Sequence, residues 1–438
     1  MLLERSPENL EDQVAMIPRP GLVEFSDIGA TPIRGLARQE GVFSGDYIVV
    51  EGTTAYRVTA SGAETSLGTV AGSGSVEIAI GAGSALICNG TNLYSTTGTS
   101  LSTVSFPDSA GVVSLAFVNG YYLAVRANSQ RVYFSGVGAL TFGGLDYFSA
   151  ENSADNLESV RVIGDEVWLL GKSSIEVHVP TGDADLPFIR VNGRLFGYGT
   201  ASRDTVARLD TSLLWVGGEV RTVFRTAPQP TRIADDNIDE RLRLANVADL
   251  HGFAFSMEGH ALYVLNMGAQ GTWAYDVSTE QWSEFGSYGL TGFRAKWSAP
   301  CGDGRFITGD SVTGKLWRLD PAVNTDAGGV LSRRVSGRLQ MAGPPARCDN
   351  LVMRCNVGAA PLDTDPMAQL RVSDDEGKTF LDHGLKSLGR QGDYRERVAW
   401  TRLGLMGARG SNSRIFEVEV TDDVFWSLES LRYNESLR

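Results

Sequence analysis

The sequence predicts an all-β protein: a six- or seven-bladed β-propeller with a C-terminal β-sandwich-like domain and an N-terminal extended arm. Glycine is abundant, at 51 of 438 residues, and only 21% of the residues are charged. This composition is typical of many short strands joined by tight turns. Apolar residues make up 42% of the chain, enough for a sizeable core. The third observation is a pattern of paired strands that recurs along the chain.

Seven segments share one plan: an apolar strand, a short polar turn, and a second strand that carries Tyr, Trp or Phe. They begin at residues 47, 85, 122, 166, 212, 261 and 305, so successive starts lie 37 to 49 residues apart. A propeller blade of four short strands occupies roughly 40 to 50 residues. Because a single hairpin cannot bury both of its faces, we expect several blades to pack around an axis. Residues 42–341 are assigned to this propeller.

The segment GTWAYDVSTEQWSEFG, residues 271–286, is similar to a kelch blade. Trp273 and Trp282 flank a polar turn that starts at Asp276. Large aromatic rings at such positions usually pack between blades, so we expect a structural role for both rather than ligand binding.

One stretch departs from the strand pattern. DDNIDERLRLANVADL, residues 235–250, has apolar side chains near helical spacing, and Asp235 or Asp236 can cap the helix. The apolar positions are Ile238, Leu242, Leu244, Val247 and Leu250. We expect a helix here, with contact to a neighbouring molecule as a hypothesis for its role.

The two ends of the chain differ from the repeat. In IPRPGLVEF, residues 17–25, Pro18 and Pro20 favour extended backbone, so residues 1–41 are expected to form an arm that runs over a neighbour or closes the propeller. Pro344 and Pro345 mark the other boundary. Beyond them, residues 346–438 contain alternating strand patterns that predict a small β-sandwich.

The C-terminal domain contains SDDEGKTF, residues 373–380, which fits the Asp box found in sialidases and other propeller proteins. Asp side chains bond nearby backbone N–H groups and Gly377 can adopt a positive φ, so the stretch predicts a rigid turn between two strands. It supplies no nucleophile and no general acid. A structural turn is the favoured interpretation, and a propeller hydrolase is the least favoured function.

Charge and cysteine content limit the function further. The net charge of −13 argues against sequence-independent binding of nucleic acid, although DNA could slide past an acidic wall. The four cysteines form no C-x-x-C pair, and reduced thiols are expected. No apolar run is long enough for a leader or a membrane span, so we expect a soluble chain that is made and folded in the cytosol, with no membrane partner.

No catalytic, cofactor-binding or metal-ligating set emerges from the sequence, and we expect no enzyme activity and no cofactor. The four histidines form no H-x-x-x-H pair, and neither a G-x-S-x-G elbow nor a phosphate-binding loop occurs. Three acidic clusters have the oxygens that Ca²⁺ prefers, but solvated turns are the simpler interpretation. They are Asp183 with Asp185, Asp363 with Asp365, and Asp374 to Glu376.

In its order of motifs the chain resembles the packaged-DNA stabilisation proteins, or tail nozzle proteins, of short-tailed bacteriophages. Three stretches carry the resemblance, and their order is kept over roughly residues 17–320. The first runs from IPRPGLVEF through IRGLARQEGVFSGDYIVVEGTTAYRV. The second is DTSLLWVGGEVRTVFRTAPQPTRIADDNIDERL (210–242), and the third is FAFSMEGHALYVLNMGAQGTWAYDVSTEQW (253–282).

The resemblance implies a structural virion protein of the phage tail. Copies would form a homo-hexameric ring below the portal and its adaptor protein, extend the DNA channel, and help to retain the packaged genome. Tail needle or fibres would dock below, and DNA would pass without tight binding. The alternative is a receptor- or glycan-binding tail component built on a propeller, because propellers and sandwiches both bind sugars.

Overall fold

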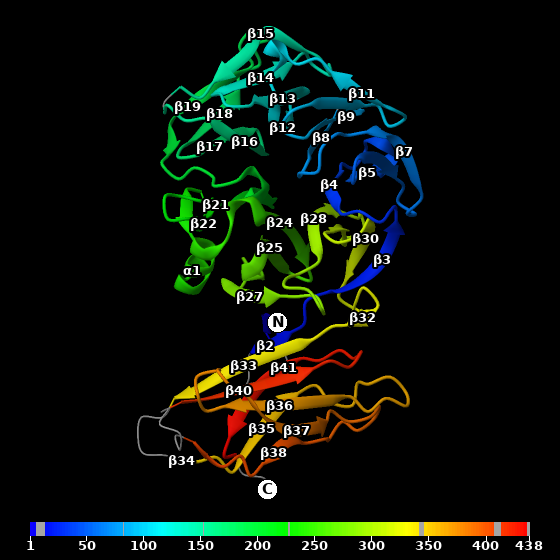
Figure 1. Ribbon diagram of the computed structural model, residues 1–438, viewed down its shortest axis with the longest axis vertical. Helices are drawn as coiled ribbons and strands as arrows, with labels where there is room; N and C mark the ends of the chain where they lie inside the picture. The colour runs from blue at the N-terminus through cyan, green and yellow to red at the C-terminus, as the bar shows by residue number, and fades with distance from the viewer. Residues whose placement is uncertain are drawn as a thin grey trace. The chain divides into compact units, whose positions relative to one another are not determined.

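The computed structural model describes residues 1–5, 14–81, 83–151, 153–226, 228–340, 346–406 and 413–435 (Figure 1). Strands dominate, and α1 (Asp236–Leu244) is the one α-helix in those ranges. The chain forms two compact units. The propeller unit comprises Glu24–Gly286 and Leu290–Leu319, and the sandwich unit comprises Met1–Val23, Ser287–Gly289 and Asp320–Arg438.

The propeller unit contains seven blades (Figure 1). Blades 1 to 6 are antiparallel sheets of four strands in which neighbours along the chain pair, and blade 7 consists of four strands of a six-stranded sheet. Blade 1 is β4 (Ile33–Arg38), β5 (Tyr47–Glu51), β6 (Thr54–Val58) and β7 (Glu64–Thr69). Blade 2 is β8 (Glu77–Gly81), β9 (Ser84–Cys88), β10 (Leu93–Thr96) and β11 (Leu101–Val104). Blade 3 is β12 (Val112–Val118), β13 (Tyr121–Arg126), β14 (Arg131–Ser135) and β15 (Phe142–Ser149). Blade 4 is β16 (Leu157–Ile163), β17 (Glu166–Gly171), β18 (Ile175–Pro180) and β19 (Phe188–Phe196).

The remaining blades follow the same plan, except that blade 7 takes its fourth strand from the start of the chain. Blade 5 is β20 (Ala207–Leu209), β21 (Ser212–Gly217), β22 (Thr222–Thr226) and β23 (Pro230–Arg232). Blade 6 is β24 (Leu250–Met257), β25 (His260–Met267), β26 (Thr272–Asp276) and β27 (Gln281–Phe285). Blade 7 is β28 (Ala295–Pro300), β29 (Phe306–Asp310), β30 (Lys315–Asp320) and β3 (Gly21–Asp27). The predicted fold class is confirmed, with seven blades.

Hydrophobic pattern and burial agree within each blade. The second strands β5, β9 and β21 are buried along their whole length, and they read as the near-continuous apolar runs expected of strands covered on both faces. The fourth strand is at the outer edge, and in β19 most residues are exposed. Each apolar cluster joins facing blades, so a blade is stable only beside its neighbours.

The segment 1–41, expected to be an extended arm, supplies strands to both units. In the sandwich unit, β1 (Leu2–Arg5) pairs with β2 (Val14–Ile17), and β2 pairs with β41 (Leu428–Tyr433). In the propeller unit, β3 and the residues that follow it contact blade 7. The Lys315 ammonium lies 2.6 Å from a carboxylate oxygen of Glu24. The backbone N–H of Ile28 also donates to the carbonyl of Gly314.

The sandwich unit has two main sheets. The four-stranded sheet has the order β33 (Arg333–Gln340), β40 (Ser413–Val420), β36 (Met367–Ser373) and β37 (Leu381–Ser387). The five-stranded sheet has the order β1, β2, β41, β35 (Asn350–Cys355) and β38 (Val398–Thr401). Shorter pairs are β34 (Ala346–Arg347) with β39 (Leu405–Met406), and β31 (Thr325–Asp326) with β32 (Gly329–Val330). The predicted boundary at Pro344 and Pro345 lies outside the described residues.

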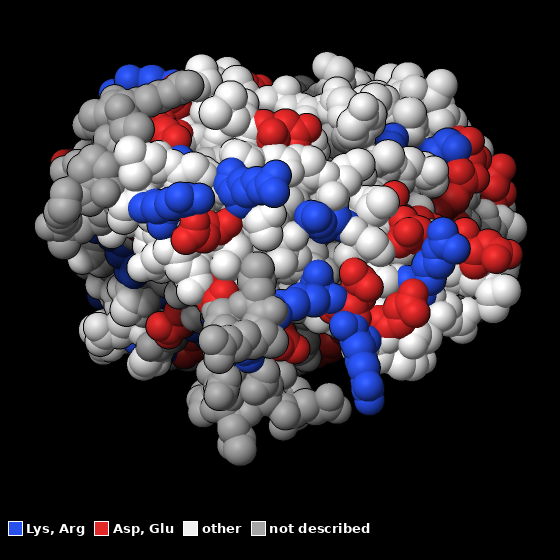
Figure 2. Space-filling model, turned by 90° about the horizontal axis from the view of Figure 1, so that it is seen from below, with Lys and Arg blue, Asp and Glu red and all other residues white. Residues whose placement is uncertain are grey.

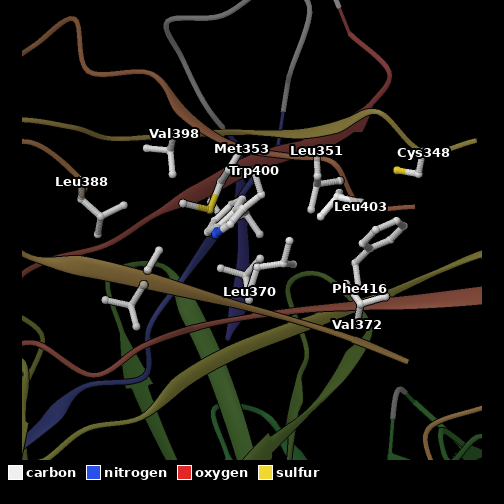
Figure 3. Close-up of a cluster of buried hydrophobic side chains, with 14 of the residues drawn as sticks. Cys348, Leu351, Met353, Leu370, Val372, Leu388, Val398, Trp400, Leu403 and Phe416 are labelled. Atoms are coloured by element: carbon white, nitrogen blue, oxygen red, sulfur yellow. The ribbon is translucent and has the colours of Figure 1, made fainter. Parts of the chain in front are cut away.

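Both main sheets contribute to one apolar core (Figure 3). Trp400 is buried in it, with Met353 and Leu370 nearby, and its indole N–H donates to the carbonyl of Gly384 at 2.9 Å. This bond removes the cost of burying an unpaired indole donor.

The predicted helix is confirmed but is shorter than residues 235–250. Asp235 caps α1, with its carboxylate accepting from the N–H of Ile238 at 2.8 Å. Ile238 and Leu242 are fully buried in the cluster that joins blades 5 and 6. These two side chains therefore serve the propeller itself, whereas Leu244 at the end of the helix is exposed.

Trp273 and Trp282 pack against that same cluster, which confirms the prediction that they fill the space between blades. The Trp282 indole donates to the carbonyl of Ile233 at 3.0 Å. None of the helical segments described is long and apolar enough to cross a membrane.

Candidate functional site: the axis of the propeller

The first strand of each blade lies nearest the propeller axis (Figure 1). Four of these strands, in blades 1, 3, 4 and 7, contain a register shift near their start. Such bulges bend a strand and redirect its side chains. In β4 the bulged residue is Arg34, and in β28 the bulge spans Trp297 and Ser298. Arg34 and Trp297 of these two bulges both line a cavity at the axis.

A turn from the connection between blades 4 and 5 enters this axial space. In the 3-10 turn η3 (Arg203–Thr205), the Arg203 guanidinium donates to the backbone carbonyls of Val113 and Ser75. The hydroxyl of Ser75 donates to the Asp204 carboxylate at 2.5 Å. Because Val113 is on blade 3 and Ser75 precedes blade 2, the turn ties the two sides of the axis together.

A second set of bonds surrounds the carboxylate of Glu77, on β8. It accepts from the Arg161 guanidinium of β16 at 2.5 Å and from the Ser114 hydroxyl of β12 at 3.0 Å. Arg161 also donates to the carbonyl of Arg203 at 3.4 Å, which links this set to the turn. Blades 2, 3 and 4 and the entering turn thus share one charged network, hereafter called the axial network. Charge-assisted bonds of this kind are stronger than neutral ones.

The axial network leaves two small cavities of about 150 and 190 Å³. The smaller one borders the network itself, since Glu77, Arg161 and Arg203 line it. The larger one lies against blades 1, 6 and 7 and is lined by Arg34, His251 and Lys296, among others. Cavities below about 300 Å³ are smaller than usual ligand pockets, so each of these two has room for a small group and not for a polymer.

Burial determines the protonation of two groups in the larger cavity. Burial lowers the pKa of His251 to about 4, although Asp204 opposes the change. Burial also lowers the pKa of Lys296 from its ordinary value, with Asp204 and Asp249 acting in the opposite direction. His251 is therefore neutral at physiological pH.

The Asp-box stretch forms a rigid turn between β36 and β37, as predicted. The Asp375 carboxylate accepts from the Thr379 N–H at 2.8 Å, the Thr379 hydroxyl at 2.5 Å and the Ser373 hydroxyl at 2.9 Å. These bonds, led by that of the Thr379 hydroxyl, lower the pKa of Asp375 to about 2. Asp374 forms a two-point ion pair with the buried Arg414, at 2.6 and 2.7 Å. The turn is thus structural.

Blade 6 contains a similar turn, whose hydrogen bonding the sequence analysis did not predict. The Asp276 carboxylate bonds the His260 imidazole at 2.6 Å, the Ser278 hydroxyl at 2.6 Å and the Thr279 hydroxyl at 3.0 Å. Burial would raise the pKa of Asp276, yet these bonds hold it below its ordinary value. Asp310 plays the same part in blade 7, where it bonds Arg294, Thr313 and Trp317. In the sequence, both turns can be found from an Asp that follows Tyr or Gly at the end of a strand, Asp276 in β26 and Asp310 in β29.

The acidic clusters and histidines do not gather into a metal site in the described parts of the chain. No group of three His, Cys, Asp or Glu side chains there is placed to hold a metal ion. Asp183 accepts from the backbone N–H groups of Asp185 and Leu186, as turn residues do. Asp365 accepts from the Ser387 hydroxyl. The described cysteines, Cys88, Cys301, Cys348 and Cys355, are free thiols.

Comparison with known proteins gives one family. The family model described as "Bacteriophage P22 Gp10, beta-propeller" matches residues 4–324 of the 438. No curated protein matches the chain.

Solved structures resemble the chain only distantly. A streptogramin B lyase structure has 11% identity and a TM-score of 0.49, covering 69% of this chain and 98% of its own. The N-terminal domain of Nup159 has 12% identity and a TM-score of 0.44, covering 72% and 98%. The WD40 propeller domain of Doa1 has 11% identity and a TM-score of 0.43, covering 68% and 96%. Likenesses this weak say nothing of function.

The family match spans nearly all of the repeat and the strand that completes blade 7. It also agrees with the seven blades of the propeller unit. The chain belongs to the family of the bacteriophage P22 Gp10 β-propeller, a family of phage structural proteins.

Proposed function

We propose that copies of this chain form the nozzle of a phage tail, a homo-hexameric ring below the portal and its adaptor. The ring extends the DNA channel, helps to keep the packaged genome inside the particle, and docks the tail needle or fibres. Membership of the phage family supports a structural role in the virion. Ring assembly requires a heterologous contact that closes on itself, which a rigid scaffold favours.

The observation that carries this proposal is the occupied propeller axis. Arg203 and Asp204 tie blade 5 to blades 2 and 3 across the space that a propeller could otherwise leave open. A DNA duplex does not pass through cavities of about 150 and 190 Å³. The DNA channel therefore lies between copies, and each propeller acts as a solid piece of its wall.

Charge is compatible with that role. The net charge is −13. On the one face seen in Figure 2, from below the view of Figure 1, Lys and Arg are scattered among Asp and Glu. Tight binding of DNA requires many Lys and Arg side chains to displace counterions. A wall of this composition lets DNA slide past it during ejection.

Genome retention tests the proposal directly. Phage particles should be assembled without this protein, and the fraction of packaged DNA that resists nuclease should be measured. We expect this fraction to be low, and to recover when the purified chain is added before the nuclease. A fraction that is already high without the protein, or that does not recover, would show that the chain does not retain the genome.

A further inference from the structure

The larger axial cavity contains two polar groups without a hydrogen-bond partner among the described residues, the Lys296 ammonium and the Nδ1 atom of His251. It lies against blades 1, 6 and 7 and adjoins the smaller cavity, with which it shares Asp204, His251 and Trp297. The residues of interest are Arg34, Asp204, Asp249, His251, Lys296 and Trp297, and all of them line it. The axial network of blades 2, 3 and 4 is complete without Lys296 or His251.

The bulge in β28 brings two of these residues to the cavity. The register between β28 and β29 shifts between Lys296 and Ala299, so two residues of β28 stand outside the regular pairing. Trp297, within the bulge, has a φ of 55°, a left-handed conformation that a bulky side chain rarely adopts. Strained backbone of this kind tends to persist where it places side chains for a function.

His251 is buried beside this bulge. Only 7% of the residue is exposed, and its ring meets the Trp297 ring edge to face, with 4.6 Å between centroids. Its Nδ1 atom has no hydrogen-bond partner among the described residues. Leaving a buried polar atom unpaired is costly, and native structures contain few such atoms without a reason.

Lys296 adds an ammonium group without a direct partner. Within the described ranges no hydrogen bond or ion pair reaches it, and Asp204 and Asp249 influence it only from beyond ion-pair distance. Asp204 is already held by Ser75 and lies 3.5 Å from the guanidinium of Arg203. An ammonium group that is partly removed from water gains by meeting an anionic oxygen.

Arg34 increases the positive charge of this side of the axis. Its guanidinium donates to the backbone carbonyls of Gly52, Gly74, Val70 and Ala71, and none of these is a carboxylate. The cavity is therefore lined by the cations Arg34 and Lys296 and the carboxylates Asp204 and Asp249. These four charges balance, but Asp204 is also close to Arg203 of the smaller cavity and bonded to Ser75, which leaves Lys296 without a direct counter-ion.

We propose that this cavity binds a small oxyanion, a phosphate or carboxylate group that accepts hydrogen bonds from Lys296 and His251. The volume of about 190 Å³ accommodates such a group and excludes a polymer. The neutral imidazole donates from one ring nitrogen, and Trp297 closes one side of the site. This function is separate from the nozzle role and does not depend on it.

The test is calorimetric titration of the full chain with inorganic phosphate and, separately, with acetate, at constant ionic strength. We expect saturable binding of at least one of the two, and the stronger of them identifies the group. Lys296→Gln should weaken binding at least tenfold. Lys172→Gln is the matched control, because this lysine lies in blade 4 with its side chain 67% exposed and should leave binding unchanged.

A second variant gives a change in the opposite direction. Asp249→Asn removes a carboxylate from the cavity without reducing the size of the side chain, so it should strengthen binding several-fold. A merely structural role for these residues would not produce that gain. If Lys296→Gln does not fold, as judged by circular dichroism, the Asp249→Asn result decides. Absence of binding at millimolar phosphate and acetate, or equal binding by wild type and a folded Lys296→Gln chain, would overturn the proposal.

Discussion

At the scale of single residues, the Asp375 turn shows how a motif associated with enzymes serves structure alone. Ser373, Asp375, Gly377 and Thr379 bond one another within the turn, and the Gly377 N–H donates to the Ser373 hydroxyl at 2.8 Å. Gly377 has a φ of 88°, a conformation that glycine adopts without steric cost. The sequence was sufficient to predict this turn because all of its partners lie within a few positions of one another.

The depressed pKa of Asp375 makes a prediction about pH. Its folded-state pKa is about 2, below the ordinary 3.8, so folding favours the carboxylate. The stabilisation is fully present above about pH 4 and is lost as the pH falls through about 2. Urea denaturation should therefore show that Asp375→Asn is less stable than wild type at pH 7, and that the difference shrinks toward pH 2.5.

The control for this prediction is Glu376→Gln, in the same turn. Glu376 is exposed and makes none of the bonds that surround Asp375. Its substitution should leave the urea midpoint unchanged at both pH values. A difference between wild type and Asp375→Asn that stays constant with pH would show that the carboxylate charge is not the source of the stabilisation.

The axial network could not be predicted from the sequence. Glu77 and Arg161 are 84 residues apart, and Arg203 is 128 residues from Ser75, so only the closure of the ring brings them together. The same holds for the cavity residues Arg34 and Lys296. A charged side chain is buried only where the fold brings a partner to it, and that partner cannot be identified from the sequence.

At the scale of elements, the repeat identified the middle of every blade. The seven predicted segments cover the second and third strands, from β5 and β6 in blade 1 to β29 and β30 in blade 7. These strands are buried on both faces, so they have the strongest apolar pattern. The first strand carries polar residues to the axis, and the fourth strand is exposed, as in β19. Neither strand therefore shows the apolar pattern by which the repeat was recognised. The sequence left open whether the arm runs over a neighbour or closes the propeller, and the structure shows that β3 closes blade 7 beside β30.

The cap of α1 gives a prediction at this scale. Asp235→Ala removes the acceptor for the Ile238 N–H, and the loss of an N-cap costs about 1 kcal/mol. Asp236→Ala, one position later, removes only an exposed ion pair with Arg232, which contributes little. Urea denaturation should therefore separate the two variants. Equal effects would show that the cap does not stabilise the helix in this protein.

The closure of blade 7 gives a second prediction. Deletion of residues 1–20 removes β1 and β2 and leaves β3, so the propeller unit should stay folded while assembly is impaired. Deletion of residues 1–27 also removes the fourth strand of blade 7 and the Lys315–Glu24 pair. Differential scanning calorimetry should show an unfolding midpoint several degrees lower for the longer deletion. Equal midpoints would show that pairing of β3 with blade 7 does not stabilise the propeller unit.

At the scale of the whole molecule, an occupied axis and an acidic composition predict weak affinity for DNA. Binding of duplex DNA, measured by fluorescence anisotropy at physiological salt, should be in the range of non-specific association or weaker, with dissociation constants of roughly 10⁻⁴ M or above. The affinity should rise little when the salt is lowered, because few phosphate contacts form. Tight, sequence-independent binding would contradict the idea of a sliding wall.

The central claim is that the chain forms a ring whose channel lies between copies, and electron microscopy tests it most directly. The purified protein should be imaged alone and after mixing with phage particles that lack their tails. We predict rings with a central channel, either free or docked at the portal vertex, in which each propeller axis is closed. Rings seen only on the particles would mean that the adaptor templates their assembly. Isolated propellers that do not bind the particles would contradict the account.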